Sequence, residues 1–213
     1  MYKRILAVLI AASLLLALAS CGAKDKVATA SDATGTDASG GVSTADGLSL
    51  RRDEAANAAV VYFSHNDVIK EAAEFAASLR GMDLIEITPQ KEYPDDETAL
   101  AERIKEEKEK SVRPALKDQP KDLNDYDILF IGFPVWEGTI PMAVATFLED
   151  YDMVDKALVP FCWAPDGEVG ESLNDIASLC RYSAITSAYM IPEGDFKNNE
   201  PVFEGWMDQT LFG

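Results

Sequence analysis

The sequence has few of the residues that most catalytic and metal-binding sites use. Its 213 residues include one histidine, His65, and three cysteines. No other metal-binding residue type lies at ligand spacing from that histidine, and the chain has no Gly-x-Gly-x-x-Gly, no P-loop and no nucleophile elbow. These absences remove the common signatures of dinucleotide enzymes, nucleotide hydrolases and serine hydrolases. No residue is recognisable as a general acid, a general base or a nucleophile.

Basic side chains are scarce relative to acidic ones. The chain holds 19 lysines and arginines against 37 aspartates and glutamates, a formal net charge of −18. Lys3 and Arg4 are the only charged residues among the first 20, so the rest of the chain carries 17 basic and 37 acidic residues. Such a surface repels nucleic acid and anionic lipid, and neither is expected as a partner. It suits a basic redox protein, although solubility alone would also account for it.

Residues 1–20 have the pattern of an export signal. The basic pair is followed by an apolar stretch, residues 5–19, that is too short for a comfortable membrane span. The stretch ends in Leu-Ala-Ser-Cys-Gly, which resembles a bacterial lipoprotein signal. That resemblance implies that Cys21 is lipidated, becomes the first mature residue and anchors the protein on the outer side of the cytoplasmic membrane. An uncleaved anchor helix and an ordinary secretory signal are the alternatives.

Residues 21–54 are predicted to be a disordered linker. Beyond Cys21 they are mostly Ala, Ser, Thr, Gly and Asp, and so cannot bury enough apolar surface to offset the entropy lost on ordering. Residues 55–213 leave room for one core of ordinary size. The expected organisation is therefore a signal at 1–20, a lipidated linker at 21–54 and one domain at 55–213.

The domain alternates short apolar runs with amphipathic segments. Strands are expected at residues 58–63, 84–88, 128–131, 158–163 and 184–191. Helices are expected at residues 67–80, 96–110, 141–148, 172–180 and 201–211. We expect Thr139 to cap the third helix, Ser172 and Asp175 to form a capping box, residues 106–110 to be a solvated face, and Val202 to be buried. This alternation predicts an α/β fold with a parallel sheet covered by helices on both faces.

Residues 126–151 organise the domain. A buried run, residues 128–131, ends at Gly132 and Pro134, a loop carrying Trp136 follows, and a helix begins near Pro141. In open parallel sheets ligands bind at the carboxyl ends of the strands. The loop around Trp136 is therefore the first candidate for a binding site.

The same region carries a family resemblance. Residues 126–141 follow the pattern Tyr-Asp-x-x-x-x-Gly-x-Pro-x-Trp-x-Gly-Thr-x-Pro. Residues 61–64, 92–94, 160–162 and 170–176 continue it, whereas the loop at 163–169 departs from the family's Gly-rich pattern. This resembles the flavodoxin-like family, in particular its short bacterial members, over roughly the last three quarters of the chain. The resemblance implies a three-layer sandwich with a five-stranded parallel sheet of order 2-1-3-4-5. It also implies FMN as cofactor, with electron transfer or flavin-dependent reduction as the activity.

By this resemblance the flavin would contact residues in three loops. They are Ser64, His65, Asn66, Pro134, Val135, Trp136, Glu137, Gly138, Trp163 and Gly170. Trp136 would lie against the flavin, or would be a rim aromatic that packs on a nearby proline. Trp163 would stack on a flat ligand or fill a vacated pocket, and the sequence does not separate these alternatives.

The phosphate loop departs from the family pattern Ser-x-Thr-Gly-Asn-Thr. Its last three positions are Asp67, Val68 and Ile69, whose side chains offer a phosphate no donor. A phosphate oxygen about 5 Å from the Asp67 carboxylate would meet roughly 3 kcal/mol of repulsion per unit charge at an effective dielectric constant near 20. The residues therefore favour a capped helix without a phosphate site. The function is then FMN-linked redox chemistry, binding of a flavin or other planar ligand without its phosphate, or an interaction module that has lost the flavin.

Two further features bear on the site. Asp67, Asp166 and Glu168 come from two loops without a metal motif, so no metal is expected. Cys162 and Cys180 are expected to be free thiols, because one ends a strand and the other ends the helix that runs back from it, at opposite edges of the sheet.

Overall fold

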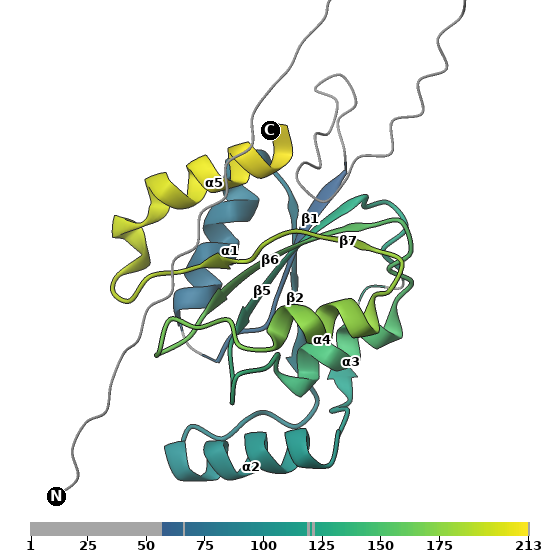
Figure 1. Cartoon of the computed structure of the whole chain (residues 1–213), viewed down its shortest axis with the longest axis vertical. Helices are drawn as coiled ribbons and strands as arrows, with labels where there is room; N and C mark the ends of the chain where they lie inside the picture. Colours follow the sequence, from purple (N-terminus) through teal and green to yellow (C-terminus); the bar gives the residue numbers. More distant parts are fainter. Residues whose placement is uncertain (1–56, 66, 119, 121, 213) are drawn as a thin grey trace, which may run out of the picture. The chain divides into compact units, whose positions relative to one another are not determined.

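Apolar strands form a parallel sheet in the computed structural model, which describes residues 57–212 apart from 66, 119 and 121 (Figure 1). The strands are β1 (Ala58–Tyr62), β2 (Asp83–Glu86), β5 (Ile128–Pro134), β6 (Ala157–Trp163), β7 (Ala184–Ile185) and β8 (Tyr189–Met190). The order is β2-β1-β5-β6-β7, and β8 also pairs with β6. The predicted order 2-1-3-4-5 is thereby confirmed. The export signal, Cys21, the linker and Asn66 lie outside the described residues.

The fifth strand is two short strands where one was predicted. β7 and β8 both run parallel to β6. Between them the amide of Thr186 donates to the carbonyl oxygen of Leu158 at 3.1 Å, and beyond them the amide of Ile191 donates to that of Cys162 at 2.8 Å. The segment therefore follows β6 as an edge with a break in its ladder. A second, two-stranded sheet, β3 (Thr88–Pro89) with β4 (Leu116–Lys117), was not predicted.

Helices cover both faces of the sheet (Figure 1). α1 (Asp67–Arg80) and α5 (Glu200–Phe212) lie on one face, while α3 (Met142–Asp150) and α4 (Ser172–Leu179) lie on the other. α2 (Glu97–Glu109) lies beyond α3, and a 3-10 helix, η1 (Phe196–Asn198), precedes α5. All seven residues of β5 are buried, as expected for a strand covered on both faces. The predicted layers are thereby confirmed.

Three local predictions were wrong: the cap of α3, the capping box of α4 and the burial of Val202. The N-cap position of α3 is Pro141 and that of α4 is Glu171. Neither side chain makes a capping hydrogen bond. The Thr139 hydroxyl instead donates to the Asp175 carboxylate on α4. Val202 is 62% exposed, because Phe203, Met207 and Leu211 occupy the buried face of α5.

Both cysteines in the described part of the chain, Cys162 and Cys180, are buried free thiols, which confirms that prediction. Burial raises the pKa of Cys162 from 9.0 to about 12 and that of Cys180 from 9.0 to about 11. Among the helices that the structure describes, none has both the length and the apolar character needed to cross a bilayer.

Candidate functional site

The loops that follow β5 and β6 leave the carboxyl edge of the sheet side by side. Pro134 and Trp163 pair as the last residues of the two strands. The amide of Val135 then donates a 2.8 Å hydrogen bond to the carbonyl oxygen of Trp163. The candidate loop therefore lies at the edge where parallel sheets bind their ligands.

Residues 136–139 form a tight turn that fixes Trp136. The amides of Trp136 and Thr139 each donate to the carbonyl oxygen of the other, both at 3.0 Å. Glu137 and Gly138 between them have φ angles of 50° and 70°, and positive φ at both central positions is what a type I′ turn requires. Lys108 on α2 donates to the carbonyl oxygen of Glu137 at 2.5 Å. The turn is therefore held by its own hydrogen bonds and by α2.

The turn is joined to the loop after β6. The amide of Glu171 donates to the carbonyl oxygen of Gly138 at 2.7 Å, and the Thr139 hydroxyl donates to the Asp175 carboxylate on α4. Gly170 has a φ of 55°, and a Cβ atom there would lie 2.3 Å from the Gly138 carbonyl oxygen. Both the backbone conformation and the space require glycine at this position. The two loops therefore form one braced rim.

Four rings from three segments meet below this rim, and we call them the aromatic cluster: Phe63, His65, Tyr93 and Trp136. The Trp136 ring centroid lies 4.9 Å from that of Tyr93, 5.2 Å from Phe63 and 5.9 Å from His65, all edge to face. Such contacts contribute about 0.5–1.5 kcal/mol each beyond area burial. Trp136 is half-buried, so the cluster holds its ring while part of it still faces solvent.

A cavity of about 540 Å³, which we call the α2 cavity, opens beside Trp136. Leu100, Ala101 and Ile104 of α2, together with Val135, Trp136 and Pro165, form its apolar walls. Three acidic residues, Glu97, Glu137 and Asp166, also line it. The volume lies within the range of small-molecule sites, which are concave and mostly apolar. The α2 cavity could therefore take a flat apolar ring.

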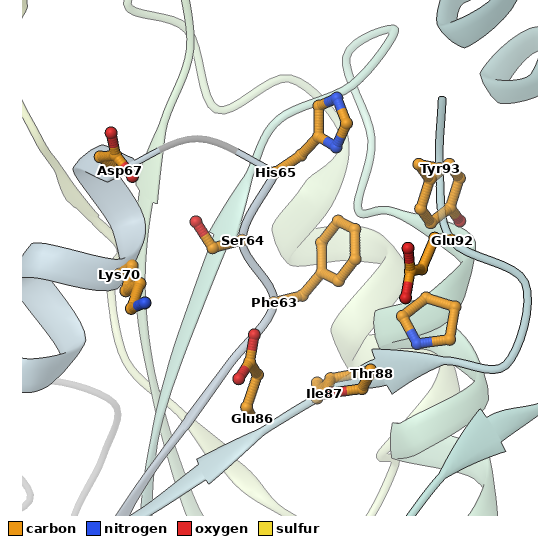
Figure 2. Close-up of a pocket in the computed structure, with 11 residues that line it drawn as sticks. Phe63, Ser64, His65, Asp67, Lys70, Glu86, Ile87, Thr88, Glu92 and Tyr93 are labelled. Atoms are coloured by element: carbon orange, nitrogen blue, oxygen red, sulfur yellow. The ribbon is translucent and has the colours of Figure 1, made fainter. Parts of the chain in front are cut away.

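A second cavity, of about 350 Å³, lies on the far side of the aromatic cluster, where β1 and β2 end and α1 begins. We call it the β2 cavity, and Figure 2 shows the side chains around it. The carboxylates of Asp67, Glu86 and Glu92 line it together with the ammonium group of Lys70. The β2 cavity is therefore acidic. Ser64, His65 and Asp67, which line it, belong to the loop that corresponds to the family's phosphate loop.

A buried ionic network of Arg103 and Glu107 holds the Tyr93 side chain in place. Glu107 is 7% exposed, so the prediction of a solvated face at 106–110 was wrong at this position. It accepts hydrogen bonds from the Tyr93 hydroxyl at 2.6 Å and from Nε of Arg103 at 2.8 Å. Arg103 also lies over the Tyr93 ring, 3.8 Å from its centroid. Burial, followed by the hydrogen bond to Glu107, raises the pKa of Tyr93 well above its ordinary value.

The structure brings most of the predicted site residues to one edge, with two exceptions. Ser64 and His65 line the β2 cavity, while Val135, Trp136, Glu137 and Gly138 line the α2 cavity. Trp163 is an exception, since its side chain packs with the core under α1 and α5, whereas Trp136 packs with the core on the opposite face. Asn66 lies outside the described residues.

Sequence reasoning missed the part that α2 plays. Glu107 lies four residues after Arg103, the spacing of a helical ion pair, which was the only available signal. Tyr93 lies before α2 in the chain, so its contact with Glu107 could not be seen from periodicity. α2 therefore contributes to the site both through this network and through Lys108.

The ring and the phosphate of FMN make different demands on these residues. The α2 cavity has the volume and the apolar wall beside Trp136 that a flat ring needs, and Glu97, Glu137 and Asp166 line the rest of it. The β2 cavity does not fit a phosphate, because a carboxylate, Asp67, stands at the first residue of α1. Ile69 is fully buried, so it cannot serve a ligand at all. No group of three or more His, Cys, Asp or Glu side chains within the described ranges is arranged to hold a metal ion.

Comparison with known proteins agrees with this geometry. The sequence profile described as flavodoxin matches residues 57–208. No curated protein sequence matches the chain. Among solved structures, the chain is similar to a proposed flavoprotein from Bacteroides eggerthii, with 26% identity and a TM-score of 0.63, covering 72% of this chain and 97% of the other.

Two further structures share the fold. A second proposed flavoprotein, from Bacteroides uniformis, has 21% identity and a TM-score of 0.63, covering 73% of this chain and 99% of the other. A flavoprotein in complex with FMN, from Lactobacillus acidophilus, has 17% identity and a TM-score of 0.55, covering 69% of this chain and 98% of the other. With the profile match over most of the chain, the parallel sheet and its order, the protein belongs to the flavodoxin family.

Proposed function

We propose that this protein binds a flavin by its ring, in the α2 cavity against Trp136, and works in electron transfer or flavin-dependent reduction. The observation that carries the proposal is the position of Trp136, on a braced turn at the carboxyl edge of the sheet beside a cavity of about 540 Å³. A bound flavin would itself supply the redox chemistry, and the protein would hold and orient it. The FMN-bound relative from Lactobacillus acidophilus supports a flavin as the ligand.

The residues around the α2 cavity would bind the flavin ring and exclude water from it. Trp136 would contact one side of the ring, while Leu100 and Ile104 of α2 would cover apolar surface. The aromatic cluster and the Tyr93–Glu107 hydrogen bond would keep the Trp136 indole in one orientation. Because these contacts are made by the protein's own side chains, they would limit the ordering that binding costs.

Absorbance tests the proposal. Purified full-length protein should show, alone or after addition of riboflavin or FMN, a perturbed flavin spectrum between about 350 and 500 nm. Trp136→Ala should weaken flavin binding by about three- to tenfold, the value of one lost aromatic contact. Tyr182→Ala removes a ring that is 76% exposed in the loop after α4 and should leave binding unchanged.

One alternative has an observation in its favour. The acidic β2 cavity supports a module that kept the fold and lost the flavin, recognising another molecule instead. An unchanged spectrum with both flavins, from folded protein, would favour this alternative over flavin binding.

We also propose that the protein works outside the cytoplasmic membrane on a lipid attached to Cys21, where a basic redox protein would be a suitable partner. The Leu-Ala-Ser-Cys-Gly motif after an apolar stretch supports the anchor, and the net charge of −18 supports the partner.

A further inference from the structure

Residues 88–117, which include α2, leave the edge of the main sheet after β2 and return to the same place. We call these residues the flap. β3 and β4 pair antiparallel at its base, and just beyond them the amide of Gln90 donates to the carbonyl oxygen of Ala115 at 2.8 Å. α2 lies within the flap, beyond α3 (Figure 1). The base is therefore closed by backbone hydrogen bonds, and the way α2 is held depends on contacts further out.

Polar contacts hold the carboxyl-terminal end of α2. The buried carboxylate of Glu107 accepts hydrogen bonds from Tyr93 and from Arg103, and Tyr93 belongs to the buried core. In the last turn of the helix, the ammonium group of Lys108 donates to the carbonyl oxygen of Glu137 at 2.5 Å. This end of α2 is therefore fixed twice, to the core through Tyr93 and to the rim through Lys108.

The segment that follows α2 is fixed to α3. Nε and Nη2 of Arg113 donate to the two carboxylate oxygens of Glu149, at 2.7 and 2.9 Å. A bidentate pair of this kind restricts orientation as well as distance. The contacts that tie α2 and its continuation to the rest of the domain therefore begin in the second half of the helix.

The amino-terminal half of α2 has different surroundings. Among the residues that the structure describes, no hydrogen bond or ion pair joins residues 97–102 to the turn around Trp136 or to the loop after β6. Glu97 and Ala101 are exposed and Leu100 is half-buried, and all three line the α2 cavity. Glu107 is the one buried residue of α2, whereas α3 buries six of its nine. This half of α2 therefore borders a cavity where most helices border packed side chains.

A helix that is fixed at one end and borders a cavity at the other can pivot. The axis from Glu107 back to Glu97 spans about 15 Å, so a rotation of about 10° at Glu107 moves the amino-terminal end by roughly 3 Å. Rotation toward Trp136 would narrow the α2 cavity and bring Leu100 and Ile104 onto a ring inside it. Apolar contact between these side chains and the ring would favour the closed arrangement.

We infer that α2 is a hinged lid on the α2 cavity. Its hinge is the contact of Glu107 with Tyr93 and Arg103, and its amino-terminal half closes toward Trp136 when a flat ring enters. This inference rests on the proposed function, since the ring that closes the lid is that of the flavin. In the open arrangement the ring enters and leaves, and in the closed arrangement Leu100 shields it from water. The lid therefore regulates access to the site.

Distances between spin labels on full-length protein test the inference. In a Cys21→Ala background, labels at Thr98→Cys and Glu171→Cys measure the amino-terminal half of α2 against the rim. Thr98 is exposed, and the backbone of Glu171 is hydrogen-bonded within the rim. Both cysteines in the described part of the chain are buried and should stay unlabelled. Saturating riboflavin or FMN should shorten the Thr98–Glu171 distance by about 2–4 Å.

A label at Glu106→Cys in place of Thr98→Cys is the matched control. Glu106 is exposed and lies one residue from the hinge, so its distance to Glu171 should change by less than about 1 Å. Flavin binding without shortening of the Thr98–Glu171 distance would overturn the lid while leaving the proposed function intact. Equal shortening of both distances would also overturn the lid, because the whole helix would then have moved. Binding of neither flavin would overturn both proposals.

The fixed end can be tested without any flavin. Lys108→Met removes the ammonium group that donates to Glu137, so the Glu106–Glu171 distances should spread over a range wider by about 2 Å. Lys105→Met is the matched control, since its ammonium group is exposed and pairs only weakly with Glu109, at 3.9 Å on the same helix. It should leave the spread unchanged. The same spread in both variants would mean that Lys108 does not fix this end, and the hinge would have to be withdrawn.

Discussion

The Tyr93 hydroxyl donates a 2.6 Å hydrogen bond to the buried carboxylate of Glu107. This contact ties the loop before α2 to the helix itself, and the Tyr93 ring then supports Trp136 at a centroid distance of 4.9 Å. Arg103 completes the arrangement by pairing with Glu107 and by donating to the carbonyl oxygens of Lys91 and Glu92. The orientation of the candidate ring-binding side chain therefore depends on a charge that lies on the inner face of a surface helix.

Removing the Tyr93 hydroxyl should destabilise the protein. Tyr93→Phe leaves a buried carboxylate with one donor fewer, and hydrogen bonds to charged groups contribute about 1.5–3 kcal/mol. Tyr126→Phe is the matched control, since its hydroxyl donates to Asp83 over the same 2.6 Å but at an exposed position. We expect less than about 1 kcal/mol from the control. Urea unfolding of both variants measures the difference, and equal losses would show that burial of Glu107 has no energetic consequence.

Adding one methyl group at Gly170 should separate the two loops. Gly170→Ala places a Cβ atom 2.3 Å from the Gly138 carbonyl oxygen. We expect a loss of more than about 2 kcal/mol in the free energy of unfolding, since backbone on both sides must move. Gly167→Ala has a similar positive φ, 72°, but nothing within 4 Å. It should cost only about 1 kcal/mol, from backbone strain alone. A Gly170 variant no less stable than the Gly167 variant would contradict the close contact.

Stability should fall steeply above pH 9 because of the two buried thiols. Burial raises the pKa of Cys162 to about 12 and of Cys180 to about 11 from 9.0, so above pH 9 the unfolded chain loses protons that the folded chain keeps. The stabilising contribution is complete below pH 9 and is lost as pH rises toward the folded pKa values. Each thiol should contribute a slope that rises from about 0.7 kcal/mol per pH unit at pH 9 toward about 1.4 kcal/mol per pH unit at higher pH.

Urea unfolding in reductant between pH 9 and 10 measures this slope, below the ordinary tyrosine pKa of 10.0. Cys162→Ala should lower the slope by about 1 kcal/mol per pH unit. The remaining slope comes from Cys180 and from tyrosines such as Tyr62, whose pKa is also raised. A slope that is the same in the variant and in the original chain would mean that the Cys162 thiol does not titrate as its burial requires.

Membrane attachment should depend on Cys21. In bacterial cells, the full-length protein should fractionate with membranes and carry a lipid on this cysteine. Cys21→Ala should leave the chain unprocessed or release it into the soluble fraction, while Cys180→Ala should not change its location. Recovery of the original chain entirely from the cytosol would contradict the anchor.

The amino-acid sequence by itself determined the layers and the place of the site. Alternating apolar runs and amphipathic segments predicted the strands and helices, because each element must bury one face or both. Residues 67–80 were placed as a helix with the bounds that the structure shows. The loop around Trp136 was correctly placed at the carboxyl edge, where open parallel sheets bind their ligands. The strand before it was predicted to end at residue 131 but continues through Gly132 to Pro134, because Gly132 and Pro134 pair with Phe161 and Trp163 of β6.

Only the tertiary structure decided how distant polar side chains pair. Thr139, Ser172 and Asp175 carry local capping signals, yet the Thr139 hydroxyl donates to Asp175 on α4 and the Ser172 hydroxyl is buried without a partner among the described residues. Glu107 lies in a charged run that indicates solvent exposure. It is nevertheless buried, because Tyr93 and Arg103 donate hydrogen bonds to its carboxylate. Local sequence fixes which faces are apolar, whereas the partner of a polar group is fixed by which segments the fold brings together.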